Sequence, residues 1–187
     1  MCGICGKIEW GGEPADLEAD VLSMMERMVH RGPDDHGVHV AAYDSLRVGL
    51  GHQRLSILDL SAAGKQPMTD GDRRAWIVYN GEVYNYRELR KELESIGHRF
   101  QSGTDTEVVL KAYQEWGAES LARLEGMFAF AIWDAVDRVL FLARDRAGIK
   151  PLHYGLTPSG LAFSSEIKSL LALPEINADV DPSTIDE

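Results

Sequence analysis

Both cysteines of the chain lie within its first five residues, at Cys2 and Cys5. Removal of Met1 by a methionine aminopeptidase would leave Cys2 with a thiol and a free α-amine. The pKa values of these groups in model peptides, near 8.5 and about 7.7–8.0, let each exchange protons near neutral pH. Such an N-terminal residue supplies nucleophile and base without a histidine. The alternative is that Cys2 is a small apolar residue at the start of a strand.

The Cys2-x-x-Cys5 spacing also allows a redox or metal interpretation. In a strand the two α-carbons would lie about 10 Å apart at ~3.3 Å per residue, whereas a disulfide needs less than about 7 Å. A zinc site would need two further ligands, and His36 with His39 are the paired candidates in the sequence. We therefore expect no metal site and a buried structural role for Cys5.

Polar groups suited to binding recur later in the chain. Arg54 stands near the end of an expected strand, where its guanidinium can hold a carboxylate or form a surface ion pair. Asn80 and Gly81 offer an amide and a backbone N–H, the donor types of an oxyanion hole, and Glu82 suits an ammonium. The alternative for this tripeptide is a plain hairpin turn. Asp105, at the start of an expected helix, would at least offset the helix dipole.

A basic group at Arg144, Arg146 and Lys150 can bind an anion. Because the chain is acidic overall, we instead expect these cations to form buried pairs with Asp145 and Glu166.

The elements that must position these groups are mostly strands. Alternation of apolar and polar residues predicts one from Ile4 to Trp10. Further strands are expected at His36–Tyr43, Leu46–Ile57, Ala75–Tyr79, Met127–Trp133, Val139–Ala143, Leu152–Leu156 and Leu161–Ser164. Asn80-Gly81 is a strong turn dipeptide and predicts the end of its strand.

Helices are expected between these strands. Leu17, Val21, Met25 and Met28 recur at helical spacing, and Asp16 is placed to cap their helix. Two more helices are expected, one capped by Asn85 and one opened by a Thr104–Glu107 capping box, with a short helix at Glu166–Leu171.

The pattern favours an α+β fold with antiparallel sheets. Both faces of Met127–Trp133 are apolar, which indicates a sheet covered on both sides. Two sheets packed together with helices outside would account for this pattern.

The composition limits the function classes. The chain has 187 residues, a net charge of −11, 44% hydrophobic and 26% charged residues, values of an ordinary globular domain. The negative charge argues against nucleic acid or an anionic membrane as a partner. The sequence shows no apolar run of about 18 residues and no secretory signal, and two cysteines cannot form a disulfide framework. We expect a cytoplasmic protein.

Six motifs, taken together and in this order, resemble the glutaminase domain of class II glutamine amidotransferases. They are Met1-Cys2-Gly3-Ile4, His30-Arg31-Gly32-Pro33-Asp34, the Gly51–Leu58 segment, Gln66-Pro67-Met68, Tyr79-Asn80-Gly81-Glu82 with Tyr84-Asn85, and Ser102-Gly103-Thr104-Asp105-Thr106-Glu107. Arg31–Asp34 and the run Arg54–Leu60 are the marks of the asparagine synthetase (glutamine-hydrolysing) branch.

The resemblance implies an N-terminal nucleophile hydrolase fold, a four-layer αββα sandwich. It implies that Cys2 attacks the side-chain amide of L-glutamine, releases ammonia and leaves a thioester that water hydrolyses to glutamate. Asn80 and the Gly81 N–H would stabilise the oxyanion. The implied substrate-binding residues are Arg54 for the carboxylate, Glu82 and Asp105 for the ammonium, and Leu55, Ser56, Ile57, Leu58, Asn80 and Gly81 around the side chain.

The resemblance also implies a second domain. Residues 1–173 correspond to the glutaminase domain, and residues 174–187 to the start of a linker toward a synthetase domain that uses ATP and Mg²⁺ to make asparagine from aspartate. No cofactor is expected in residues 1–173, and a homodimer is one option for the assembly.

Two alternatives stay open. One is an ordinary Cys–His hydrolase with His30 or His52 as base, and the other is a non-catalytic module that binds an amino acid or a protein partner.

Overall fold

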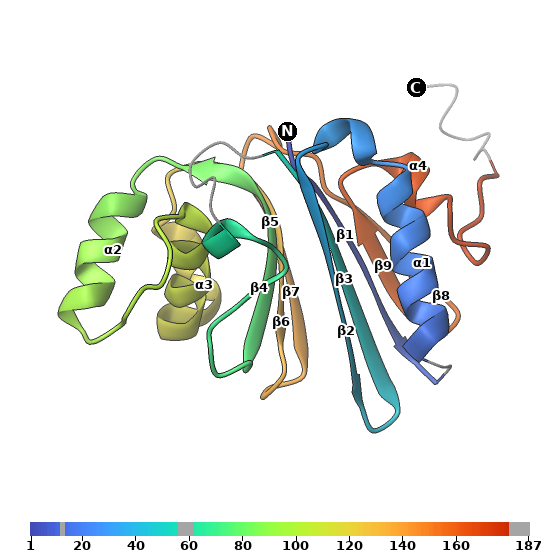
Figure 1. The fold of residues 1–187 in the computed structure, drawn as a ribbon, viewed down its shortest axis with the longest axis horizontal. Helices are drawn as coiled ribbons and strands as arrows, with labels where there is room; N and C mark the ends of the chain where they lie inside the picture. Colours follow the sequence, from blue (N-terminus) through green and yellow to red (C-terminus); the bar gives the residue numbers. More distant parts are fainter. Residues whose placement is uncertain (12–13, 56–61, 180–187) are drawn as a thin grey trace.

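The protein is a sandwich of two antiparallel sheets with helices on both outer faces (Figure 1). The computed structural model describes residues 1–11, 14–55 and 62–179. Within them, the first sheet has the strand order β2-β3-β1-β9-β8, which places β1 in the middle. Its strands are β1 (Gly3–Trp10), β2 (Asp35–Tyr43), β3 (Leu46–Arg54), β8 (His153–Thr157) and β9 (Gly160–Ser164).

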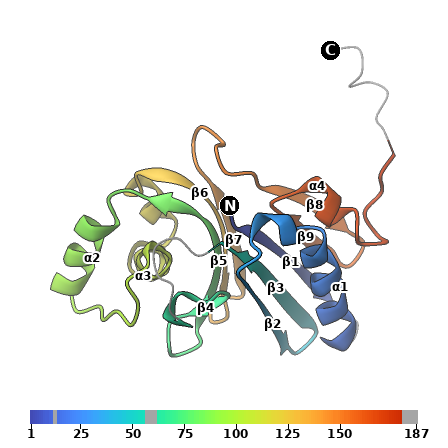
Figure 2. The ribbon, with the colours of Figure 1, turned by 45° about the horizontal axis from the view of Figure 1, so that its top comes forward.

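The second sheet has the order β4-β5-β6-β7. Its strands are β4 (Met68–Thr69), β5 (Ala75–Val83), β6 (Gly126–Asp134) and β7 (Val139–Arg144). Helices α1 (Pro14–Glu26) and α4 (Ile167–Leu170) cover the first sheet, whereas α2 (Tyr86–Ser95) and α3 (Asp105–Trp116) cover the second (Figure 2). The expected α+β fold of two sheets with helices outside is therefore confirmed.

Strand β6 shows why the second sheet needs cover on both faces. Its alternate residues Phe128, Phe130 and Ile132 join a buried cluster with side chains of α2 and α3. Ala129, Ala131 and Trp133 face the other way, into a cluster with β1 and β3. Because successive side chains of a strand point to opposite faces, the continuous apolar run is divided between two cores.

Strand β1 divides its side chains in the same way. Ile4 and Ile8 lie in the core between the sheets, and Cys5 packs beneath α1 with no exposed surface. The predicted buried structural role of Cys5 is confirmed. Cys2 and Cys5 are both free thiols.

The turn predicted at Asn80-Gly81 is wrong, because β5 continues through both residues to Val83. Asn80 pairs with Ala129, and Gly81 pairs with Phe128. A Cβ at position 81 would lie 2.6 Å from the Met127 carbonyl oxygen, so glycine is needed here for a close approach of two strands. Pairing with β6 overrides the local turn preference.

Helix ends differ from the predictions in two places. The first helix begins at Pro14, a favoured first residue, and Asp16 lies in its first turn instead of capping it. Asn85 precedes α2, but its side chain does not cap the helix; it bonds to the Arg123 carbonyl and the Glu125 N–H.

Thr104 caps α3 as predicted, since it accepts from the Glu107 N–H. The predicted capping box is not completed, because the Glu107 carboxylate accepts from the Gln101 and Ser102 N–H groups and the Thr104 N–H donates to Ser102 Oγ. Among the described residues, none of the helices has the length and apolarity needed to cross a membrane.

Candidate active site

The Cys2 thiol lies where β1 begins, beside the end of β3. Gly3 pairs with Gln53 in the ladder between these strands, so residue 2 comes opposite the last residues of β3. The Cys2 sulfur lies 3.4 Å from the Leu55 nitrogen, which donates to it, and 3.5 Å from the Leu55 carbonyl oxygen, to which the thiol donates. Backbone groups thus hold the sulfur on two sides.

A cavity of about 70 Å³ opens beside this thiol. Its lining comes from both sheets and from the start of α3: Cys2, His52, Arg54, Leu55, Gly64, Gln66, Tyr79, Gly81, Thr104, Asp105 and Thr106. Five of the predicted site residues, namely Cys2, Arg54, Leu55, Gly81 and Asp105, therefore meet at one cavity. Ser56, Ile57 and Leu58 lie outside the described residues.

Burial raises the pKa of the Cys2 thiol, and this effect outweighs the Leu55 N–H and the positive charges of Arg54 and Lys150, which lower it. The thiol is therefore mainly protonated at neutral pH. A nucleophile in this state needs a base nearby at the moment of attack.

The open edge of β5 supplies backbone donors to the cavity. Strand β4 pairs only Met68 and Thr69 with β5, so the edge beyond it has no strand partner among the described residues. Side chains take over: the Tyr79 N–H donates to Gln66 Oε1 at 2.6 Å, and the Val83 N–H donates to Asp105 Oδ2 at 3.0 Å.

The Gly81 N–H points to the same edge, because alternate residues of an antiparallel strand direct their N–H groups to the same side. Gly81 also lines the cavity. Its neighbour Asn80 has only 2% of its surface exposed, and its Nδ2 has no hydrogen-bond partner within the described residues. A backbone N–H and a side-chain amide with unused donor capacity therefore lie one residue apart.

Asp105 contributes a buried carboxylate from the first turn of α3. Its Oδ2 accepts from the Tyr79 hydroxyl at 2.7 Å as well as from Val83. Burial raises the pKa of this carboxyl despite those hydrogen bonds. A cation entering the cavity would therefore find a carboxylate whose negative charge it can stabilise.

The two other predicted binding residues, Arg54 and Glu82, differ in whether they line the cavity. Arg54 is 7% exposed and lines the cavity. Glu82 is exposed near the end of β5 and does not belong to the described lining of the cavity.

His52, Gln66 and Tyr79 also line the cavity, although the sequence indicates no role for Gln66 or Tyr79. Gln66 and Tyr79 belong to motifs that resemble those of the family, but a glutamine or a tyrosine can equally line a binding site or fill a hydrophobic core. The sequence allows His52 as a base. Its Nε2 lies 3.2 Å from the Tyr79 carbonyl oxygen, and burial lowers its pKa to about 4. A histidine with this pKa is a weak base at neutral pH.

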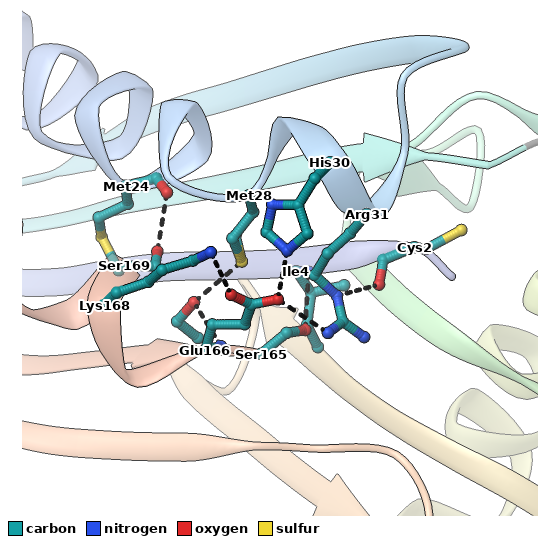
Figure 3. A network of polar contacts seen from close by, with 11 residues as sticks. Cys2, Ile4, Met24, Met28, His30, Arg31, Ser165, Glu166, Lys168 and Ser169 are labelled. Carbon is teal, nitrogen blue, oxygen red and sulfur yellow. Dashed lines mark hydrogen bonds and ion pairs between the residues drawn. The ribbon is translucent and has the colours of Figure 1, made fainter.

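His30, the other candidate base, lies on an exposed surface and bonds to Glu166 at 2.8 Å (Figure 3). The predicted pairing of Glu166 with the basic group at 144–150 is wrong, because its carboxylate contacts His30, Arg31 and Lys168 instead.

Asp145 is also used differently from the prediction. Its carboxylate accepts from the backbone N–H groups of Phe128, Ile149 and Lys150. The carboxylate therefore organises a loop through backbone donors.

Comparisons with known proteins agree with this geometry. A family model described as "Glutamine amidotransferase domain" matches residues 1–187. Asparagine synthetase [glutamine-hydrolyzing] 3 of Bacillus subtilis is 42% identical over 190 residues, covering 100% of this chain and 30% of the relative. Putative asparagine synthetase [glutamine-hydrolyzing] 2 of Methanocaldococcus jannaschii is 41% identical, covering 95% of this chain and 36% of the relative. The chain thus spans about a third of the length of these relatives.

Among solved structures, the glutamine phosphoribosylpyrophosphate amidotransferase of B. subtilis, complexed with ADP and GMP, superposes with a TM-score of 0.73. It is 22% identical, and the match covers 91% of this chain and 43% of the other. The two share the N-terminal nucleophile hydrolase sandwich.

Proposed function

Because the chain belongs to the glutamine amidotransferase domain family, class II and asparagine synthetase-like, we propose that it hydrolyses the side-chain amide of L-glutamine through a Cys2 thioester. One observation carries the proposal. The Cys2 thiol borders a cavity to which Arg54 and Asp105 bring opposite charges, as the carboxylate and ammonium of a free amino acid require.

The first step needs a base, because the Cys2 thiol is mainly protonated. Once Met1 is gone, the α-amine of Cys2 takes the thiol proton while the sulfur attacks the amide carbon. The tetrahedral intermediate then expels ammonia, which leaves with the proton returned by the amine. Water attacks the resulting thioester, and glutamate and the free thiol are released.

The negative oxygen of both intermediates needs donors that are already in place. Asn80 Nδ2 and the Gly81 N–H fill this role, since the first is a buried donor without a partner within the described residues and the second belongs to a residue that lines the cavity. Preorganised donors of this kind stabilise a developing oxyanion without reorganisation at the moment of reaction.

Substrate selection follows from charge. The Arg54 guanidinium binds the α-carboxylate of glutamine, and Asp105, assisted by Glu82, binds the α-ammonium. Leu55 contributes backbone groups beside the sulfur, and Ser56, Ile57 and Leu58 continue the same segment. No metal or cofactor takes part in these steps.

The ammonia has a further destination in our proposal. The chain covers 30% and 36% of two relatives named asparagine synthetases. We propose that a synthetase domain, which uses ATP and Mg²⁺ to make asparagine from aspartate, receives the ammonia. The stretch after residue 173 would lead to it, although contact with the glutaminase fold continues through Glu175, which pairs with Lys7 at 2.8 Å, to Ile176, which packs against the cluster beneath α1.

The experiment measures glutamate released from L-glutamine by protein whose intact mass proves the loss of Met1. Cys2→Ala and a form that retains Met1 should both lose activity, and rapid denaturation should trap a thioester on Cys2. Cys5→Ala is the matched control, because Cys5 is buried under α1 and should keep activity.

Glutamate release by Cys2→Ala would refute the mechanism. Glutamine binding without any trapped thioester would instead identify a non-catalytic amino-acid-binding module.

A further inference from the structure

The residues that follow β9 fix the backbone at the start of β1. The ladder between these strands ends at Cys5 and Ser164. One residue further, the Ser165 N–H donates to the Ile4 carbonyl at 2.8 Å, and the Ile4 N–H donates to Ser165 Oγ at 3.0 Å (Figure 3). Both backbone groups of Ile4 are therefore held by one serine.

The Cys2 carbonyl points to the same side of β1 as the groups of Ile4, since the direction repeats every two residues. The chain has by then turned away into α4, so β9 offers no donor there. Arg31 supplies one: its Nε donates to the Cys2 carbonyl oxygen at 2.9 Å (Figure 3). The guanidinium does what a further residue of β9 would do in a longer ladder.

Glu166 in turn holds Arg31. Its Oε1 lies 3.0 Å from Arg31 Nη1 and 2.8 Å from His30 Nε2, and its Oε2 lies 3.0 Å from Lys168 Nζ. Burial alone would raise the pKa of this carboxyl, but its hydrogen bonds to Lys168, Arg31 and His30 lower it to about 2. Glu166 is thus an anion at every pH at which the protein would work.

We propose that Glu166 is a positioning residue for the nucleophile: it orients the Arg31 guanidinium, whose Nε fixes the Cys2 carbonyl and thereby the directions of the thiol and the α-amine. The inference rests on the proposed function. It matters because an N-terminal residue has no preceding peptide to restrain it. Carbonyl, amine and thiol all branch from one α-carbon, so fixing the carbonyl limits the other two.

The kinetic consequence is a loss of turnover more than of binding. The proposed substrate ligands Arg54 and Asp105 stand on β3 and α3, whereas Glu166 follows β9. A misplaced nucleophile with intact ligands lowers kcat and leaves KM nearly unchanged. Displacements of about 1 Å can cost about 100-fold in rate.

Three substitutions at Glu166 separate the effect of side-chain length from the effect of the negative charge. Glu166→Gln keeps an oxygen at the right distance to accept from Arg31 but loses the charge. Glu166→Asp keeps the charge but is one methylene too short, and Glu166→Ala loses both. We expect kcat to fall about 10- to 100-fold for Ala and Asp and to stay within about fivefold of wild type for Gln, with KM within about threefold in all.

The control is Glu175→Ala, which removes a carboxylate paired at 2.8 Å with Lys7 of β1, the strand that begins just after Cys2. It should keep kcat within about twofold, because Lys7 lies on the α1 side of β1 and retains Asp20. Should the Glu166 variants fail to fold, Arg31→Lys replaces them, since it removes the planar guanidinium that contacts Glu166 and the Cys2 carbonyl through two different nitrogens.

A second readout needs no turnover. With ¹³C-carbonyl cysteine the chain gives two labelled positions, and the Cys5 signal is an internal reference. Loss of the Arg31 hydrogen bond should move the Cys2 carbonyl signal in the Ala and Asp variants but not in Gln or Glu175→Ala. Unchanged kcat and an unmoved signal in Glu166→Ala would overturn the inference, as would a higher kcat for Asp than for Gln. A wild type that releases no glutamate, with the signal moving as expected, would instead overturn the proposed function.

Discussion

Asn80 carries a buried amide nitrogen for which the described part of the chain offers no acceptor. Leaving a buried donor unpaired costs about 1–3 kcal/mol, so a group of this kind is better explained by chemistry than by folding. In Asn80→Ala we expect kcat to fall about 10²- to 10³-fold through loss of one oxyanion donor, with a Tm no lower than that of wild type. Steady-state glutaminase kinetics and thermal unfolding measure both.

Asn85 is the matched control, five residues away on the same segment. Its amide bonds to Arg123 and Glu125, so Asn85→Ala should lower Tm and keep kcat. If Asn80→Ala kept full turnover and lost stability instead, the amide would be structural and the oxyanion hole would lie elsewhere.

At the residue scale, a site residue can be predicted from sequence when its own chemistry or a local motif identifies it, and not when its role depends on distant partners. Cys2 can be identified because an N-terminal thiol has distinctive chemistry, and Asp105 because its helix cap is readable. For Glu166 the sequence predicts the wrong cations, since its true partners His30 and Arg31 are about 135 residues away in sequence. Such contacts depend on the tertiary arrangement of the strands, which a local sequence pattern does not predict.

At the scale of the element, β5 shows tertiary pairing overcoming a local signal. Asn80-Gly81 has the composition of a turn, yet both residues pair with β6. The burial of both faces of β6, in contrast, can be predicted from the sequence, because a strand that is apolar on both faces must cover both. The turn propensity of Asn80-Gly81 misleads because the glycine serves a close approach of two strands. The apolar pattern of β6 predicts correctly because burial alone determines it.

Gly81→Ala tests the steric need for glycine in β5. The added Cβ would lie 2.6 Å from the Met127 carbonyl oxygen and 2.8 Å from Phe128 Cα. We expect a loss of about 1–3 kcal/mol in the free energy of unfolding, the usual cost of overpacking, measured by chemical denaturation.

Gly103→Ala is its control, because a Cβ there would meet nothing within 4 Å; its stability should change by less than about 0.5 kcal/mol. Equal stabilities for the two variants would contradict a steric role for Gly81.

At the scale of the whole molecule, His52 joins the two sheets. It stands on β3, and its Nε2 bonds to the Tyr79 carbonyl on β5. Burial lowers its pKa to about 4, from 6.5 in the absence of the fold. As pH falls, the unfolded chain therefore takes up the proton first. The stability that depends on neutral His52 is complete above about pH 6.5 and is lost as pH falls toward 4.

We expect the free energy of unfolding to fall between about pH 6 and 4.5 with a contribution from His52 of about 1.4 kcal/mol per pH unit. In His52→Gln the curve should be flatter by about that slope, even if its value at neutral pH is lower. Denaturation series at several pH values measure the difference. Parallel curves for wild type and variant would mean that His52 is already protonated in the folded protein.

The central place of β1 also sets the order in which the molecule can assemble. β1 is synthesised before the other described strands, yet one of its two neighbours is β9, near the other end of the described chain. Contacts between such distant segments form slowly and late. The support of the Cys2 carbonyl through Arg31 and Glu166 therefore cannot exist before residue 166 has left the ribosome. A growing chain carries its cysteine unsupported, and its reactivity matures with the last strand of the sheet.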